Sequence, residues 1–146
     1  MADTQLPAPA PVVTAESKEF WDATAEGKLL LPKCQSCGVV FWYPRPICGD
    51  CGSMDVAFIP SSGRGTIYTY TVNRRGTGDV AEYKNVGVFV LAYVQLEEGP
   101  RLLTNLVNVE PDPKKLRCDM PVEVVFEKQT DEISLPMFQP ATGSAR

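Results

Sequence analysis

The residues best suited to chemistry are four cysteines in two Cys-x-x-Cys pairs, Cys34 with Cys37 and Cys48 with Cys51. Two residues between the cysteines allow one tight turn to direct both sulfurs at the same point. A glycine follows each pair and tolerates the positive φ that such a turn often needs. The spacing therefore predicts that the four thiolates surround a single zinc ion as a tetrahedral shell.

A shell of four cysteines leaves no open coordination position, so we expect this zinc, one per chain, to be structural rather than catalytic. Iron in a rubredoxin-like site is the chemical alternative, because sulfur tetrahedra suit both metals. Two disulfides or a redox dithiol are less favoured, because two pairs of identical spacing are too regular for either and nothing in the sequence indicates secretion.

Composition restricts what else the chain can do. Its 146 residues carry a net charge of −4, whereas a general nucleic-acid binder needs a basic face. Histidine is absent, and with it the commonest general base and the usual partner of a serine or cysteine nucleophile. The fifth cysteine, Cys118, is therefore expected to be a passive thiol.

The sequence lacks the usual signs of export and membrane insertion. No run approaches the roughly 20 apolar residues of a membrane span. The first residues lack the basic start and apolar core of a signal peptide. Four cysteines in metal-binding pairs and one left over fit a reducing compartment. We therefore expect a cytoplasmic protein that does not bind a membrane.

The elements that must hold the cysteines can also be predicted. A short helix is expected over residues 15–27, with Thr14 as its cap and Gly27 as its stop. The β-branched and aromatic residues 39–43 are expected to form a hairpin that brings the two cysteine pairs together. Four parts result: a flexible arm over residues 1–14, the helix plus zinc ribbon over 15–62, an OB-fold domain over 63–141 and a loose tail over 142–146.

Beyond the ribbon the sequence predicts a series of strands. Five are expected, over residues 65–73, 86–94, 101–109, 121–128 and 133–138. In the first, Tyr68 and Tyr70 should share one face, and the second is apolar on both faces, as a central strand should be. The fold class is therefore mainly β, with a short N-terminal helix, a four-cysteine ribbon and a five-stranded OB-fold barrel.

The order of these features resembles the acyl-CoA-associated OB-fold family, whose members carry a rubredoxin-like N-terminal zinc ribbon. The resemblance covers about residues 15–141 and rests on GKLL before the ribbon and on GTIYTYTV, EEGPRLLTNLV, MPVEVVFE and LPMFQPA after it. It implies a small accessory subunit that pairs with a thiolase-like or MaoC-like protein in acyl-CoA chemistry, either carbon–carbon cleavage or acyl transfer. The family assigns no catalytic residue to this subunit, so only the four cysteine ligands are carried over.

The polar loop 73–85 supplies candidate ligands for coenzyme A. Arg74, Arg75 and Lys84 lie among glycines; guanidinium groups match phosphate oxygens, and glycine lets the backbone approach. Coenzyme A carries phosphates that such a loop would hold near the interface with the partner. The alternative is a solvated loop whose charges form surface ion pairs.

A candidate interface follows from aromatic residues around the helix and ribbon, Trp21, Phe41, Trp42 and Tyr43. Trp and Tyr are frequent interface anchors, and a ribbon and a barrel of this size are expected to share little core that would bury them.

The alternative function is a nucleic-acid-binding module, because ribbons and OB folds both occur in such proteins. Fold alone is weak evidence for that function and the acidic charge opposes it, so no nucleic-acid partner is predicted.

Overall fold

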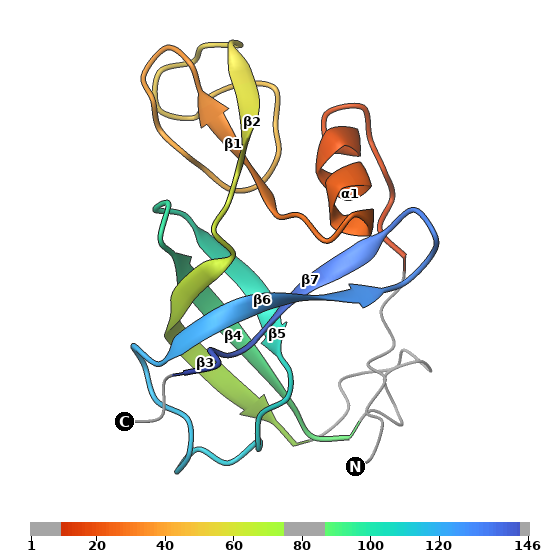
Figure 1. Ribbon diagram of the computed structural model, residues 1–146. Coiled ribbons are helices and arrows are strands. Elements are labelled where there is room, and N and C mark those ends of the chain that lie inside the picture. Colours follow the sequence, from red (N-terminus) through yellow and green to blue (C-terminus); the bar gives the residue numbers. More distant parts are fainter. Residues whose placement is uncertain (1–9, 75–86, 144–146) are drawn as a thin grey trace.

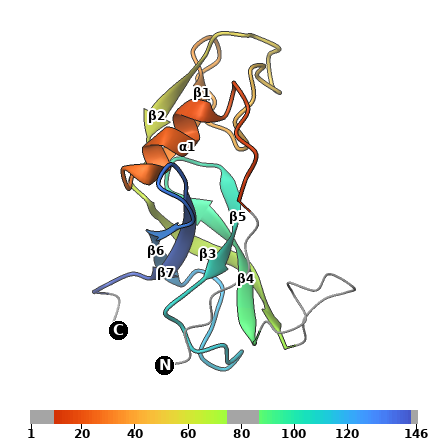
Figure 2. The same ribbon diagram turned by 90° about the vertical axis from the view of Figure 1, so that its right-hand side faces the viewer.

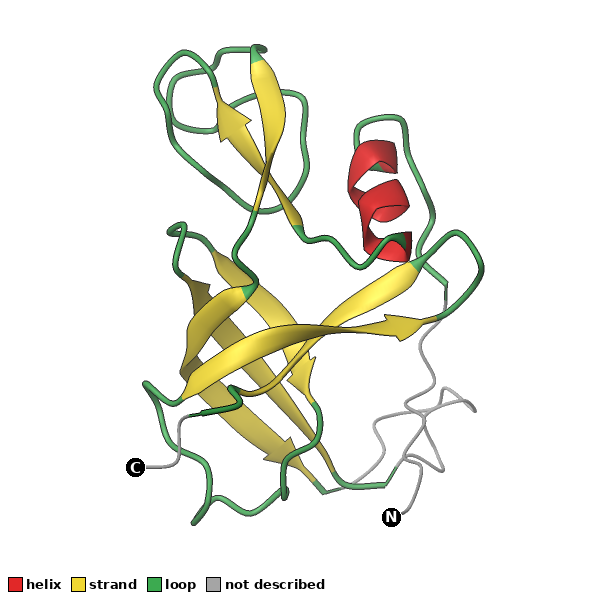
Figure 3. Cartoon of the chain, viewed as in Figure 1, coloured by secondary structure: helices red, strands yellow, loops and turns green. Residues whose placement is uncertain are grey.

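The computed structural model describes residues 10–74 and 87–143. A small two-stranded sheet lies above a five-stranded barrel, and one short helix packs beside them (Figures 1 and 3). The described chain is thus mainly β. The predicted fold class, a short helix followed by a four-cysteine ribbon and a five-stranded barrel, is confirmed.

The helix α1 spans Lys18–Ala25 and begins later than predicted. Thr14 is not its cap: its carbonyl accepts the Ser17 amide in a preceding turn, and Ser17 takes the N-cap position. The predicted stop at Gly27 is correct, because Gly27 adopts a φ of 73° and its amide donates to the Thr24 carbonyl. No helix within the described residues has the length and apolarity needed to cross a membrane.

The ribbon consists of β1 (Leu30–Cys34) and β2 (Val56–Pro60), which pair antiparallel. The hairpin predicted over residues 39–43 does not form. That segment runs back along β1 instead, where Val40 makes one antiparallel bridge with Lys33. The Cys34 amide donates to the Val39 carbonyl and the Phe41 amide donates to the Pro32 carbonyl, so the backbone groups of this segment pair with β1 rather than with one another.

Five strands form the barrel: β3 (Arg64–Asn73), β4 (Phe89–Leu96), β5 (Arg101–Leu106), β6 (Pro121–Lys128) and β7 (Ser134–Pro140). They close in the order β3-β4-β5-β7-β6, which Figure 2 shows from the side. Neighbours are antiparallel except β5 and β7, which run parallel. A closed five-stranded barrel of this kind is the OB architecture.

A β-bulge at Tyr68 changes the faces predicted for β3. The pairing with β4 slips by one residue between Ile67 and Thr69, so Tyr68 is the extra residue of the bulge. Tyr68 is exposed, whereas Tyr70 packs against the core. The prediction that the two tyrosines share a face is therefore wrong, because it assumed an unbroken alternation.

β4 alternates between buried and more exposed residues instead of being buried on both faces. Val90, Ala92, Val94 and Leu96 point into the barrel, while Tyr93 between them is exposed. A barrel has a single interior, so even a strand with two paired neighbours keeps one face outside. The prediction of a strand covered on both faces is corrected accordingly.

One apolar core extends from the barrel into the helix and the first half of the ribbon. Phe20 of α1, with Leu29 and Leu31 at the start of the ribbon, belongs to the same buried cluster as the barrel residues Ile67 and Phe138. The Ser134 amide of β7 also donates to the Thr24 hydroxyl of α1. The expectation that ribbon and barrel share little core is therefore wrong.

The link between ribbon and barrel is held by the turn between β4 and β5. The Glu98 carboxylate accepts the Ser61 hydroxyl at 3.0 Å and the Ser62 amide, and Glu97 accepts the Ser62 hydroxyl at 2.9 Å. Partial burial raises the pKa of Glu98, but the hydrogen bonds from Ser62 and Ser61 outweigh burial, so its pKa lies below the ordinary value of 4.5. The charged carboxylate therefore fixes the point where the chain leaves the ribbon.

Candidate metal centre and aromatic groove

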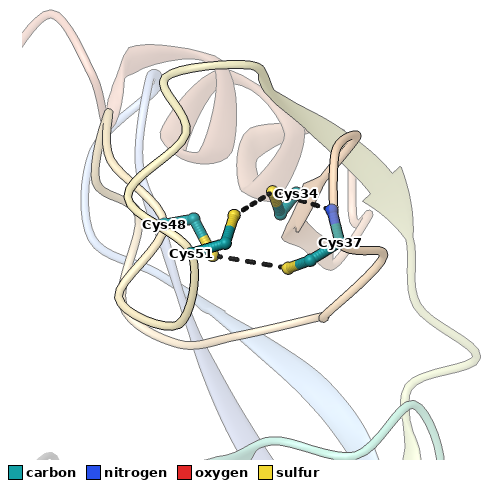
Figure 4. Close-up of side chains that lie close together, drawn as sticks. All are labelled: Cys34, Cys37, Cys48 and Cys51. Carbon is teal, nitrogen blue, oxygen red and sulfur yellow. Dashed lines mark hydrogen bonds between the residues drawn. The ribbon is translucent and has the colours of Figure 1, made fainter.

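Four thiol groups converge at the end of the ribbon farthest from the barrel (Figures 1 and 4). The Sγ atoms of Cys34 and Cys51 lie 3.6 Å apart, those of Cys37 and Cys48 lie 3.7 Å apart, and all four lie within 4.8 Å of one another. Zinc–sulfur bonds of about 2.3 Å give a regular tetrahedron with edges of roughly 3.8 Å. The separations therefore suit one tetrahedral metal ion.

The two cysteine pairs are positioned by the same local turn. The Gly38 amide donates to the Cys34 carbonyl at 2.9 Å, and the Gly52 amide donates to the Cys48 carbonyl at 3.0 Å. These glycines have φ values of 78° and 74°, a region where other residues are strained. The sequence motif thus dictates this part of the site directly, as predicted.

The electrostatics of the thiols also favour a cation. The Cys37 amide donates to Cys34 Sγ and, against the opposing effect of burial, lowers the pKa of Cys34 to about 6. The Val39 amide acts in the same direction on Cys37, but burial and the three neighbouring sulfurs outweigh it and raise the pKa of Cys37 to about 12. One thiolate therefore makes the next harder to form, and a bound cation would offset this repulsion.

The metal end of the ribbon has a small core of its own. Cys34 and Cys48 are buried together with Phe41, and Val39 and Val56 pack against them. The described residues hold no second cluster of His, Cys, Asp or Glu with comparable spacing. With all four sulfurs engaged, the centre can stabilise the ribbon but offers no free position for a substrate.

Three of the four residues predicted as an interface lie close together. The ring centroids of Phe20 and Trp42 are 5.0 Å apart, those of Phe20 and Trp21 are 4.8 Å apart, and those of Trp42 and Tyr43 are 5.4 Å apart. Trp21 and Trp42 are half-buried and Tyr43 is exposed. Phe41 lies instead in the ribbon core, so any contribution it makes to an interface is indirect.

These aromatic rings form one side of a groove with a volume of about 430 Å³, which we call the aromatic groove. It is lined by Val12, Ser17, Phe20, Trp21, Trp42, Tyr43, Pro44, Leu102, Leu103, Thr104, Asn105, Leu135, Pro136 and Met137. None of these residues is charged. The groove runs between α1, the segment after the first cysteine pair and the strands β5 and β7.

The barrel side of the groove was not predicted from the sequence. Leu103 on β5 faces outward and is 45% exposed. The alternation of inward and outward residues along 101–106 would have indicated this orientation. The sequence also gave no sign that the guanidinium of Arg101 would lie 3.6 Å from the ring centroid of Tyr68.

The remaining predicted residues do not form a site in the described structure. Arg74 is exposed just after the end of β3, while Arg75 and Lys84 lie outside the described residues. Cys118 is an exposed free thiol before β6, far in sequence from the cysteine cluster. Their predicted roles therefore remain predictions.

A four-cysteine ribbon followed by an OB barrel defines the structural class of the protein. The sequence profile of the ChsH2 rubredoxin-like zinc ribbon domain matches residues 21–57, and that of the ChsH2 C-terminal OB-fold domain matches residues 58–127. The two matches adjoin and together cover most of the chain. The protein belongs to the ChsH2/DUF35 family, and the resemblance deduced from the sequence is confirmed.

Three curated relatives illustrate the family. A "DUF35 domain-containing scaffold protein" of Methanothermobacter thermautotrophicus is 36% identical over 68% of this chain and 72% of its own length. The "Benzoylsuccinyl-CoA thiolase subunit BbsA" of Thauera aromatica is 26% identical over 81% of this chain and 78% of its own. The "Probable enoyl-CoA hydratase alpha subunit" of Thermomonospora curvata is 32% identical over 91% of this chain, which spans only 40% of that relative.

A solved structure gives the same picture in three dimensions. A chain of the "Ltp2-ChsH2(DUF35) aldolase" superposes with a TM-score of 0.76 and 31% sequence identity. The match covers 91% of this protein and all of that chain. The ribbon and the barrel are therefore shared with a component of that aldolase.

Proposed function

We propose that this protein is a non-catalytic accessory subunit that assembles with a thiolase-like enzyme acting on an acyl-CoA. The observation that carries the proposal is the match, over 91% of the chain, to a chain of the Ltp2-ChsH2(DUF35) aldolase. The names of the thiolase subunit and scaffold relatives support it. The reaction is carbon–carbon cleavage or acyl transfer on a coenzyme A ester.

The chain's own residues support a structural role. The sequence contains no histidine, and the clustered cysteines leave no open metal position. Cys118 lies apart from them as a lone exposed thiol. In this proposal the nucleophile and the general base belong to the partner, while the ribbon and barrel stabilise the complex and shape the approach to the acyl-CoA site.

Co-expression tests the proposal. The chain should co-elute from size-exclusion chromatography with a thiolase-like protein of its organism, and acyl-CoA turnover should require both. The isolated chain should show no thiolase, hydratase or thioesterase activity. Substantial turnover by the isolated chain, abolished by a substitution within it, would contradict the non-catalytic role.

We also propose that the metal is one structural zinc ion per chain. The tetrahedral separations and the match to a zinc ribbon support zinc. Iron is the alternative, since a rubredoxin-like shell binds either metal. Elemental analysis should give one zinc per chain; a red protein with one iron and visible thiolate-to-iron absorption would assign the site to iron instead.

A contact with coenzyme A is proposed for the loop that begins at Arg74. Arg74 is exposed after β3, and an exposed guanidinium is suited to bind a phosphate of a ligand held by the partner. Replacing Arg74 and Arg75 by alanine should leave assembly intact and raise KM for the coenzyme A ester. An assembled variant with an unchanged KM would show that the loop is only a solvated surface.

A hydratase partner is the second candidate, because two relatives are named as hydratase alpha subunits. Each of them is more than twice as long as the region it shares with this chain, so its activity need not reside in that region. Co-expression with a MaoC-like hydratase, scored by co-elution and hydration of an enoyl-CoA, separates the two partners.

A nucleic-acid-binding module remains the least favoured reading, and the absence of a mobility shift with single-stranded DNA or RNA would agree with the acidic charge.

A further inference from the structure

We propose that the aromatic groove and the exposed face of β5 beside it form the seat for a segment of the partner polypeptide. The segment inserts apolar side chains into the groove and places basic side chains against the acidic residues that flank it. This inference rests on the proposed function, and it adds to that function the surface used and the chemistry of the segment that fits it.

The groove is a joint product of ribbon and barrel. Trp21 comes from α1, Trp42 and Tyr43 come from the ribbon, and Leu103 and Met137 come from the barrel strands β5 and β7. The walls of the groove are thus contributed by α1, the ribbon and the barrel together. A partner bound here would contact both halves of the subunit at once and hold their relative position.

The apolar surface continues beyond the groove along the barrel. Leu103 lies directly opposite Tyr93 of β4 in the antiparallel register, and both side chains are exposed. Tyr43 on the far wall is 60% exposed. Exposed large apolar side chains that adjoin a groove are typical of a protein interface, in which aromatic anchors at the centre supply most of the binding energy.

The open walls favour a polypeptide over an acyl chain as the occupant. An acyl chain gains most when its surface is enclosed, as in pockets that bury most of a small ligand. Here Tyr43 on one wall and Leu103 on the other remain accessible to solvent. A protein segment covers such walls as it fills the groove, so both are removed from water together.

Charge identifies the chemistry of the partner and argues against a second copy of this chain. Two of the segments flanking the groove, residues 14–26 and 128–137, carry six carboxylates and only two lysines, whereas Arg45 and Arg101 adjoin the lining elsewhere. Both lysines already pair with neighbouring carboxylates, Lys18 with Asp22 and Lys128 with Asp131. Two copies meeting through this face would bring like charges together, whereas basic side chains on a partner would be attracted.

The distribution of tryptophan makes this proposal directly measurable. The chain has two tryptophans, Trp21 and Trp42, and both line the groove. Protein labelled with 5-fluorotryptophan therefore carries two ¹⁹F signals, each reporting on the groove. We expect both signals to shift when the unlabelled thiolase-like partner is added to full-length, metal-loaded chain.

Matched variants test which apolar surface is used. Leu103→Glu should raise Kd for the partner at least tenfold, because it places a charge on the buried side of the interface. Met54→Glu is the control, since Met54 is 75% exposed on the ribbon and does not line the groove. It should change Kd by less than twofold. Both substituted side chains are exposed, so unfolding is not expected to confuse the comparison.

Charge reversal tests the basic character of the partner segment. Glu16→Lys and Glu132→Lys, each made singly, should weaken binding and reduce its dependence on salt. Asp55→Lys, on the exposed surface of the ribbon, is the matched single charge reversal and should change neither. Equal effects of all three variants would contradict a specific basic contact with the acidic segments that flank the groove.

The outcomes separate this inference from the proposed function. Co-elution with the thiolase-like partner without any change in the ¹⁹F signals would overturn the groove proposal and leave the subunit role standing. Failure to co-elute would overturn the proposed function itself. Signals that shift with concentration in the isolated chain, or on deletion of residues 1–9, would show that the groove is occupied by a second copy or by the chain's own arm, and would also overturn the inference.

Discussion

The metal end of the ribbon and the barrel are stabilised in different ways. The ribbon end has a buried cluster of only Cys34, Phe41 and Cys48 and a single pair of short strands. The barrel closes a five-stranded sheet around a continuous apolar core that also includes Phe20 of α1. Small units that lack an adequate core usually need a metal or a disulfide. The comparison teaches that one chain combines a small region whose four thiols suit a stabilising metal ion with a larger region stabilised by packing.

The largest expected effect is a loss of structure confined to the metal end of the ribbon. Cys48→Ser removes one of four ligands, and structural zinc contributes on the order of 10 kcal/mol to a small ribbon. We expect the metal content to fall to near zero and the loops around the cluster to lose structure, while the barrel stays folded. Elemental analysis and amide hydrogen exchange measure the two effects separately.

Cys118→Ser is the control for this experiment, because Cys118 is an exposed thiol outside the cluster. It should leave the metal content unchanged. If Cys48→Ser also removed the hydrogen-exchange protection of amides throughout the barrel, the barrel would depend on the metal as well, and the contrast between the two regions would be wrong.

A substitution in the barrel core should have the opposite outcome, lowering the stability of the fold without removing the metal. Phe138 is fully buried on β7, and Phe138→Ala should lower the free energy of unfolding by about 3–5 kcal/mol through lost contacts and a cavity. Urea denaturation of the metal-loaded chain measures this loss. The metal content of the folded fraction should stay at the wild-type value; a proportional loss of metal would show that the two regions unfold as one.

The link between the regions should show a smaller effect that depends on backbone geometry. Gly63 has a φ of 71°, and a Cβ there would lie 2.5 Å from Val124 Cγ1. Gly63→Ala should therefore cost about 2 kcal/mol or more, because strain at positive φ adds to displacement of Val124. Gly27→Ala is the matched control, with a φ of 73° and open space around the Cβ. Equal losses of unfolding free energy would show that contact with Val124 contributes nothing.

The smallest expected effect concerns the Glu98 carboxylate at the same link. Its pKa is lowered in the folded protein, so its stabilising contribution is present above the ordinary value of 4.5 and is lost as pH falls through the folded pKa. Glu98→Gln should reduce stability by about 1 kcal/mol at neutral pH, a modest value because the group is partly exposed. The difference from wild type should vanish in acid. A difference that persists unchanged at low pH would attribute the loss to packing instead of charge.

The cysteine site and the order of elements could be predicted because both are local properties. Two residues between cysteines and a following glycine determine the turn around Cys34 and Cys48 whatever the rest of the chain does. The stop of α1 at Gly27 has the same origin. Strand positions followed from β-branched and aromatic runs, although their ends differed from the predicted ranges by a few residues.

Features that depend on distant residues could not be predicted in this way. The bulge at Tyr68 arises from pairing with β4, and it reverses the faces of the rest of β3. Phe41 appeared equivalent to Trp42 in the sequence, yet one lies in the ribbon core and the other packs against the barrel core. Adjacent residues point in different directions, and only the folded neighbours decide which direction becomes buried.

By itself, then, the sequence determined the four-cysteine cluster, the short helix, the mainly β character and membership of its family. The tertiary structure decided the aromatic groove, because its walls come from α1, the ribbon and the strands β5 and β7. Residues such as Trp21 and Met137 are separated by more than a hundred positions and meet only when the ribbon packs on the barrel. Spacing along the chain encodes a metal shell, whereas a groove requires the distances between elements that folding alone establishes.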